Sequence, residues 1–561
     1  MRIPILLRIV ILALLAAVAY LWATALMDSL YAYRSLLASL PPRPGQALLP
    51  AGEPPPARRV IYVLIDGLRI DTALDAQIMP YLGKIRSQGA WAVMHSQPTS
   101  YSQTGYGSLF TGGWPEISDG GLINLEPPQL YTWTQDNLFS AARRAGLTTA
   151  IAAHEVFQTL IPSDALTASY FTPRTDVLAD EEVVQAALSW IEDGGYDLVV
   201  IHLNQVDHAG HYEGGPLDPR WNEAARRTDD LLGEIASRLD LNKDVLFVSS
   251  DHGHIDAGGH GGDEAIVLQQ PFALVGARVR QGDYGDVQMV DVAPTLAALL
   301  GANLPAISQG QVLTDMLDFS ESEQENIQKA TAIQQETLSA AYLRAIGASP
   351  SDPPAGVDPV TGNQELMQDA RQQRLNREMA PRFLIALVVL ILPLIWMVKR
   401  LRSELLWLIG GAVLTVLVFH LRYSLMNSRT YSLSTLSSAN EIISYVGITI
   451  FMAGIVGWVA ASLDRGIFRQ PPASAALWSL NLSLVTVWLV SIPLMWSFVM
   501  NGVTITWTVP DWPSTFHGFL ALLQILFIAV LGIALGGVTP VIAWYRGKKS
   551  VPAAMTGDQE A

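Results

Sequence analysis

Long uninterrupted apolar stretches lie near both ends of the chain. One covers residues 3–27, and five more follow residue 380, at about 382–398, 404–420, 440–462, 475–499 and 515–544. A helix needs about 20 apolar residues to cross a bilayer core. One such stretch alone could be a buried core helix, but five in succession with polar connectors favour membrane insertion. The pattern therefore predicts six spanning helices, one N-terminal and five C-terminal.

Basic residues predict how these helices are oriented. Arg2 and Arg8 lie at the start of the first stretch. The connectors that would share their side are also basic, with Lys399, Arg400, Arg402, Arg465, Arg469, Arg546, Lys548 and Lys549. The opposite connectors carry only Arg422 and Arg429. Because Lys and Arg concentrate on the cytoplasmic side, we expect the segment between the first two spans in the periplasm, extracellular space or a lumen.

The first stretch is expected to remain in the protein as an anchor, because it is longer than the core of a usual signal peptide. Removal of residues 1–27 is the alternative, since Ala23-Thr24-Ala25 resembles a cleavage site. Both alternatives leave the following segment on the same side of the membrane.

Between the membrane stretches, apolar runs of strand length alternate with helical patterns. The runs lie at 58–65, 147–152, 197–203 and 244–250, and the helical patterns at 135–145, 180–192 and 219–239. Strands that are apolar on both faces and alternate with helices are typical of a doubly wound, mostly parallel α/β sheet. In such sheets the functional crevice lies beyond the carboxyl ends of the strands.

These patterns predict six regions along the chain. They are an anchor at 1–30, a linker at 31–57, an α/β catalytic domain at 58–315, a helical and Pro-rich connector at 316–380, a five-helix membrane domain at 381–545 and a cytoplasmic tail at 546–561.

Composition narrows the candidate chemistry. The net charge is −16, and no basic stripe offsets it, which argues against a nucleic acid polymer as partner. The chain has no cysteine, so any metal site must be built from His, Asp and Glu.

Such residues gather in three clusters at the ends of predicted strands. Asp66 forms the first, and the others comprise Asp207, His208 and His211, then Asp251, His252, His254 and His260. The fold brings strand ends together, so we expect these clusters to form a site for two metal ions. Carboxylates and neutral imidazoles suit zinc, with manganese and other divalent ions as alternatives. Asn204, His208 and His254 are weaker candidates for substrate contacts.

A hydroxyl-rich segment at 98–113 precedes a predicted short helix. A serine at a helix start benefits from the N-terminal dipole, which favours an alkoxide and a bound phosphate. An ordinary N-cap is the alternative for any one of these hydroxyls.

Several motifs in order resemble the alkaline phosphatase superfamily, specifically its type I phosphodiesterase/nucleotide pyrophosphatase branch and the catalytic domain of GPI ethanolamine phosphate transferases. They are Val63-Leu-Ile-Asp66-Gly67, Pro98–Gly112, Asp207-His-Ala-Gly-His211, Ser250-Asp-His-Gly253, His260-Gly-Gly-Asp263 and Val290–Gly301.

The resemblance implies two metal sites and a nucleophile. Asp207, His211 and His260 would hold one ion, while Asp66, Asp251 and His252 would hold the other. Ser102 would be the nucleophile, with Ser100 as the alternative.

The resemblance also implies an enzyme that cleaves or transfers phosphate esters through a phosphoryl-serine intermediate. Its partners would be membrane lipids and a phosphoester substrate, with lipid-linked esters favoured by the membrane helices. A hydrolase of soluble nucleotides or small phosphodiesters is one alternative, and a non-catalytic receptor with the same fold is another.

Overall fold

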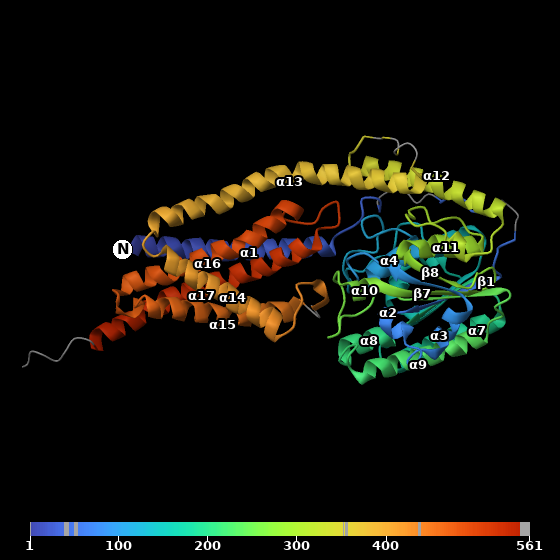
Figure 1. The fold of residues 1–561 in the computed structure, drawn as a ribbon, viewed down its shortest axis with the longest axis horizontal. Coiled ribbons are helices and arrows are strands. Elements are labelled where there is room, and N and C mark those ends of the chain that lie inside the picture. Colours follow the sequence, from blue (N-terminus) through green and yellow to red (C-terminus); the bar gives the residue numbers. More distant parts are fainter. Residues whose placement is uncertain are drawn as a thin grey trace, which may run out of the picture.

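The computed structural model describes residues 2–38, 44–49, 54–349, 351, 353, 357–435 and 439–549. They form an α/β part and a bundle of long helices that lie end to end (Figure 1). The predicted tail from residue 550 onward lies outside the described residues. So do residues 39–43 and 50–53 of the predicted linker and residues 350, 352 and 354–356 of the predicted connector.

An eight-stranded sheet with the order β4-β3-β5-β1-β6-β7-β2-β8 forms the centre of the α/β part. Its strands are β1 Arg59–Ile65, β2 Ala90–His95, β3 Thr149–His154, β4 Ala168–Thr172, β5 Leu198–Leu203, β6 Asp244–Ser249, β7 Gln269–Gly276 and β8 Gly282–Gln288. All neighbouring strands are parallel except that β7 runs antiparallel to β6 and β2. The predicted mostly parallel α/β sheet is therefore confirmed.

The three strands at the centre, β5, β1 and β6, are buried along their whole length. Strands that are apolar on both faces need helices on both sides. Helices α4, α5, α11 and α12 pack on one face, and α2, α3, α7 and α9 pack on the other.

The α-helices of this part are α2 Ile70–Leu74, α3 Pro80–Gln88, α4 Ser102–Thr111, α5 Leu138–Arg144, α6 Val156–Leu160, α7 Leu178–Asp193, α8 Gln205–Tyr212, α9 Pro219–Ser237, α10 Ala265–Leu268, α11 Val292–Leu300 and α12 Glu321–Ala345.

Six helices of the described chain are long and apolar enough to cross a membrane, as the sequence predicts. They are α1 Arg2–Tyr31, α13 Pro359–Arg400, α14 Leu405–His420 with its π-helical extension Leu421–Met426, α15 Ala439–Asp464, α16 Pro472–Asn501 and α17 Trp512–Lys549. Many large apolar side chains of α1 and α13 are exposed on the bundle, as a lipid-facing surface requires. The chain is a multi-pass membrane protein.

Helix α13 joins the two parts. It runs without a break from beside α12 into the bundle (Figure 1). Its Arg371 forms an ion pair of 2.8 Å with Glu116 of the α/β part. The same guanidinium donates to the Thr508 hydroxyl at 2.8 Å and to the Val509 carbonyl at 3.1 Å, both in the α16–α17 loop, residues 502–511.

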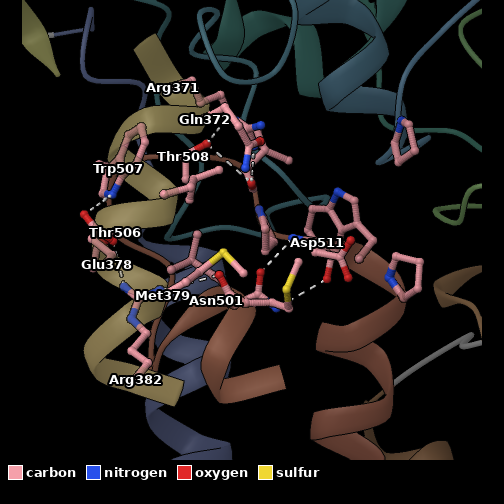
Figure 2. A pocket seen from close by; sticks show the side chains of 18 of the residues that line it. Arg371, Gln372, Glu378, Met379, Arg382, Asn501, Thr506, Trp507, Thr508 and Asp511 are labelled. Carbon is pink, nitrogen blue, oxygen red and sulfur yellow. Dashed lines mark hydrogen bonds and ion pairs between the residues drawn. The ribbon is translucent and has the colours of Figure 1, made fainter. Parts of the chain in front are cut away.

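Further contacts extend this joint toward the bundle (Figure 2). The Trp507 indole donates to Glu378 at 3.0 Å, and Arg382 pairs with the same carboxylate at 2.7 Å. These residues line a pocket of about 370 Å³. Most of their charged groups are paired with one another, so the pocket acts as a joint between helix and loop.

The substitution Arg371→Met should lower the free energy of unfolding by about 1–3 kcal/mol, because it leaves Glu116 largely buried without its cation. We expect less than the full cost of a buried pair, since the Arg371 side chain is 31% exposed. Burial already raises the pKa of Glu116, so the double variant Glu116→Gln/Arg371→Met should recover part of the loss. Thermal unfolding of the detergent-solubilised full chain measures both effects, and an unchanged midpoint for Arg371→Met would contradict the role of this pair.

Candidate metal centre and active site

Neighbouring strands bring the three predicted clusters to one edge of the sheet. Strand β1 lies between β5 and β6. Asp66 follows β1 directly, Asp251 follows β6 after one residue, and Asp207 lies in the first turn of α8, just beyond β5. The carboxyl ends of parallel strands thus place these carboxylates together.

One group of polar atoms surrounds the nitrogen Nε2 of His252. Asp66 Oδ1 lies 3.3 Å from this nitrogen, Asp251 Oδ2 lies 3.4 Å away, and Ser102 Oγ lies 3.1 Å away. The other oxygen of each carboxylate is occupied. Asp251 Oδ1 accepts the N–H of Gly67 at 3.2 Å, and Asp66 Oδ2 accepts from His202 at 2.9 Å and from the Tyr106 hydroxyl.

The arrangement around His252 fits a cation. Its Nδ1 donates to the Gly253 carbonyl at 3.1 Å, so the neutral ring directs a lone pair from Nε2. Asp66 Oδ1 and Asp251 Oδ2 are buried and have no hydrogen-bond donor among the described residues. Acceptors that face acceptors in a buried site favour a positive ion between them.

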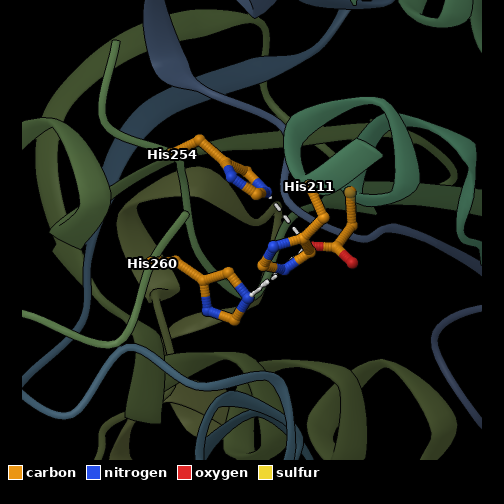
Figure 3. A group of neighbouring side chains, drawn as sticks. His211, His254 and His260 are labelled. Atoms are coloured by element: carbon orange, nitrogen blue, oxygen red, sulfur yellow. Dashed lines mark hydrogen bonds and ion pairs between the residues drawn. The ribbon is translucent and has the colours of Figure 1, made fainter. Parts of the chain in front are cut away.

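A second group surrounds Asp207 Oδ1 (Figure 3). His211 Nε2 lies 3.4 Å from this oxygen, and His260 Nε2 lies 3.6 Å away. The two imidazole nitrogens are 2.9 Å apart. His260 Nδ1 donates to the Ser100 carbonyl at 2.9 Å, which orients the lone pair of Nε2 toward Asp207. This set also suits a divalent cation.

The two groups are adjacent. The His252 and His260 rings are stacked with centroids 3.7 Å apart. Asp207 Oδ1 lies 4.0 Å from His252 Nε2, so this carboxylate stands between the groups. The structure therefore brings together all six residues that the sequence proposes as ligands, with Ser102 beside them.

His254 also lies close to Asp207, with Nε2 2.9 Å from Oδ1. However, His254 Nδ1 accepts the backbone N–H of Gly259 at 2.9 Å. The proton of the neutral ring must then sit on Nε2, where it is donated to Asp207. His254 is completely buried and lies outside the residues that line the cavity. This geometry fits a residue that orients Asp207 rather than a metal ligand or a substrate contact.

Negative charge dominates this centre. Burial raises the pKa of Asp251 well above its ordinary value, and the charge of Asp66 raises it further. Burial by itself lowers the pKa of His252, but the charges of Asp251 and Asp66 outweigh burial and raise it to about 10. The crowded carboxylates thus attract a positive charge, which a divalent metal would supply.

A cavity of about 1060 Å³ opens over these groups. Ser102, Asp66, Asp207, His211 and His260 line it. Among the described lining residues none is Lys or Arg. A phosphate in this cavity would therefore depend on bound cations for neutralisation.

The weaker candidates differ in position. Asn204 and His208 line the cavity. Ser100 is buried, and its hydroxyl is engaged by donating to the Gly262 carbonyl at 3.0 Å and accepting from the Gly261 N–H at 2.9 Å. Ser102 is the serine that opens into the cavity, at the first position of α4.

Sequence reasoning missed three residues at this centre. Asn124 lines the cavity, accepts the Gln103 N–H at 3.0 Å and donates to Ser102 Oγ at 3.5 Å. His202 and Tyr106 hold Asp66, as described above. A histidine inside a strand was the signal available for His202, whereas nothing local distinguishes Asn124.

Residues 60–344, just over half of the chain, match the type I phosphodiesterase / nucleotide pyrophosphatase family. The chain therefore belongs to this family. The matched range takes in α12 as well as the sheet.

Curated relatives are similar to the same region. Human GPI ethanolamine phosphate transferase 2, catalytic subunit, is 27% identical over 286 residues, which are 47% of this chain and 28% of that protein. GPI ethanolamine phosphate transferase 2 of Yarrowia lipolytica is 27% identical over 308 residues, which are 50% of this chain and 35% of that protein. The chain thus spans only about a third or less of the length of these relatives.

Among solved structures, human ectonucleotide pyrophosphatase / phosphodiesterase 5 is 15% identical, with a TM-score of 0.41. The similarity covers 46% of this chain and 100% of that chain.

Two substitutions distinguish a ligand from a residue that orients one. His211→Ala should reduce the zinc content by one ion per chain. His254→Gln should keep the wild-type zinc content, because the amide can still donate to Asp207. The affinity for zinc should fall about 10-fold or more, because the amide orients the carboxylate less well than the imidazole does. Elemental analysis and zinc titration of the purified full chain measure these effects, and equal loss of zinc in both variants would make His254 a ligand.

Proposed function

We propose that this protein is a membrane-bound enzyme that uses two divalent metal ions, most suitably zinc, to cleave or transfer phosphate esters. The supporting observation is the convergence of buried acceptor atoms without a cationic side chain beside the hydroxyl of Ser102. Asp207, His211 and His260 would hold one ion, and Asp66, Asp251 and His252 the other.

Ions bound at these groups would neutralise phosphate oxygens and lower the pKa of the serine hydroxyl. Ser102 Oγ then forms a bond to phosphorus while the bond to the leaving alcohol oxygen breaks, and the proton of the serine passes to that alcohol. The N-terminal end of α4, which begins at Ser102, and the Asn124 amide, 3.5 Å from Ser102 Oγ, would favour phosphate oxygens beside the nucleophile.

The phosphoryl-serine would be resolved by a second attack at phosphorus. Water would form the new bond in a hydrolase, and a sugar or lipid hydroxyl would form it in a transferase. In both cases Ser102 Oγ leaves and regains its proton. The names of the curated relatives favour transfer of phosphoethanolamine.

The apolar wall that the bundle contributes to the cavity favours a lipid-linked substrate. Leu26 and Leu30 of α1, Ile442 of α15, and Phe516 and Phe519 of α17 line it. A phosphoester at Ser102 could therefore keep its lipid chains against membrane-spanning helices. The distribution of basic residues supports placing this cavity on the extracytoplasmic side.

Soluble nucleotides or small phosphodiesters remain the second candidate. The specific observation in their favour is the polar part of the cavity lining, to which the α/β part contributes Asn204, His208 and Glu155.

Ser102→Ala should abolish turnover of a chromogenic phosphodiester, by a factor of at least about 10³, because it removes the attacking oxygen. Zinc content should stay at the wild-type value, since the carboxylate and imidazole ligands remain. Ser108→Ala is the matched control, since the Ser108 hydroxyl donates to the Thr104 carbonyl within the same helix, and it should retain turnover. Activity of Ser102→Ala near that of wild type would transfer the role to another hydroxyl.

Phe519→Ser tests the lipid-linked substrate. This change should lower kcat/KM for a labelled phosphatidylethanolamine about 10-fold, because one cavity wall loses apolar surface. Turnover of the soluble chromogenic diester should be unchanged. Phe527→Ser is the matched control, since Phe527 is partly buried in the same helix but packs on Phe451 of α15, with ring centroids 5.9 Å apart. Equal loss on both substrates would refute lipid selectivity of this wall.

A further inference from the structure

We propose that the α14–α15 loop of the bundle, described here for residues 427–435, positions the metal ligand His260. The inference rests on the metal centre of the proposed function. It assigns to the bundle a role in the catalytic centre beyond anchoring.

Three hydrogen bonds connect this loop to the segment that carries His260. The Gly262 N–H donates to Ser434 Oγ at 2.9 Å. Ser434 Oγ donates to Glu264 Oε2 at 2.7 Å, and Thr430 Oγ1 donates to Glu264 Oε1 at 3.1 Å. Ser434 is only 2% exposed, so its hydroxyl is committed to these partners away from solvent.

The opposite side of the same segment is held by the α/β part. His260 Nδ1 donates to the Ser100 carbonyl at 2.9 Å. Ser100 Oγ accepts the Gly261 N–H at 2.9 Å and donates to the Gly262 carbonyl at 3.0 Å. Residues 260–262 are therefore fixed between Ser100 and Ser434, one from each part of the protein.

Two glycines of the segment lie where the loop approaches it closely. The φ angle of Gly262 is outside the left-handed region, so its backbone does not demand glycine. A methyl group at Gly262 would instead overlap the Ser432 hydroxyl, and one at Gly259 would overlap the Ser434 carbonyl. Gly262 of the His260-Gly-Gly-Asp263 motif thus accommodates the approach of the bundle.

The loop is itself held to the bundle. Arg429 pairs with Glu441 of α15 at 2.5 Å and donates to the Thr435 carbonyl at 3.1 Å. Leu433 of the same loop lines the cavity. The same short loop therefore contacts the segment that carries His260 and also forms part of the cavity wall. A change in its position would alter the metal site made by His260, Asp207 and His211.

The test is Ser434→Ala in the full chain, with Thr508→Val as matched control, since Thr508 is a loop hydroxyl of the bundle that accepts a hydrogen bond from Arg371 of α13. Competition with a zinc chelator should show one of the two ions bound about 10–100-fold more weakly in Ser434→Ala, with the other unchanged. Excess zinc should restore turnover. Thr508→Val should bind both ions as wild type does. If Ser434→Ala does not fold, Thr430→Val removes the outer hydrogen bond instead.

A second readout needs no metal. Hydrogen–deuterium exchange of the metal-free protein should be faster at residues 259–264 in Ser434→Ala than in wild type or Thr508→Val. Unchanged zinc affinity at both sites together with unchanged exchange would overturn the inference, and so would equal weakening of both ions. A wild-type chain that binds no zinc would instead overturn the proposed function, while the exchange measurement would still decide the role of the loop.

Discussion

Mutual repulsion among three closely spaced carboxylates, two of them fully buried, is the constraint around which this protein is organised. Asp66, Asp207 and Asp251 meet where β1, β5 and β6 end, and imidazole nitrogens rather than cationic side chains surround them. In Asp66, Asp251, His252 and His260 the outward-facing atom is tied to a backbone group or a neighbouring side chain, so that the other polar atom faces the centre. Such a centre is stable in a folded protein only if positive charge enters it.

The bundle and the α/β part share this centre. Helices α1, α15 and α17 supply the apolar wall of the cavity, while the sheet supplies its polar floor. The joint around Arg371 and the contact at Ser434 both hold the two parts together. A simple tether needs only one membrane helix, whereas three spans line this cavity.

Strong local patterns made much of the fold predictable. The central strands are apolar on both faces, and the spans are long and uniformly apolar, so neither depends on distant contacts for its recognition. Strands β2, β4, β7 and β8 were not predicted. The edge strands β4 and β8 are only partly buried and mix polar with apolar residues, as in Gly282–Gln288. The antiparallel β7 is preceded only by the four-residue α10, which is too short to mark a crossover in the sequence.

The sequence by itself determined the candidate ligand types and their convergence, because each cluster begins just beyond a strand that the alternating pattern reveals. Only the tertiary structure decided which of these residues face the candidate metal sites and which residues orient them. The Gly259 N–H sets the proton on His254, Asn124 reaches Ser102 from 22 residues away, and Ser434 reaches Gly262 across 172 residues. Such contacts depend on the packing of two separately patterned parts, and no local pattern along the chain records where those parts touch.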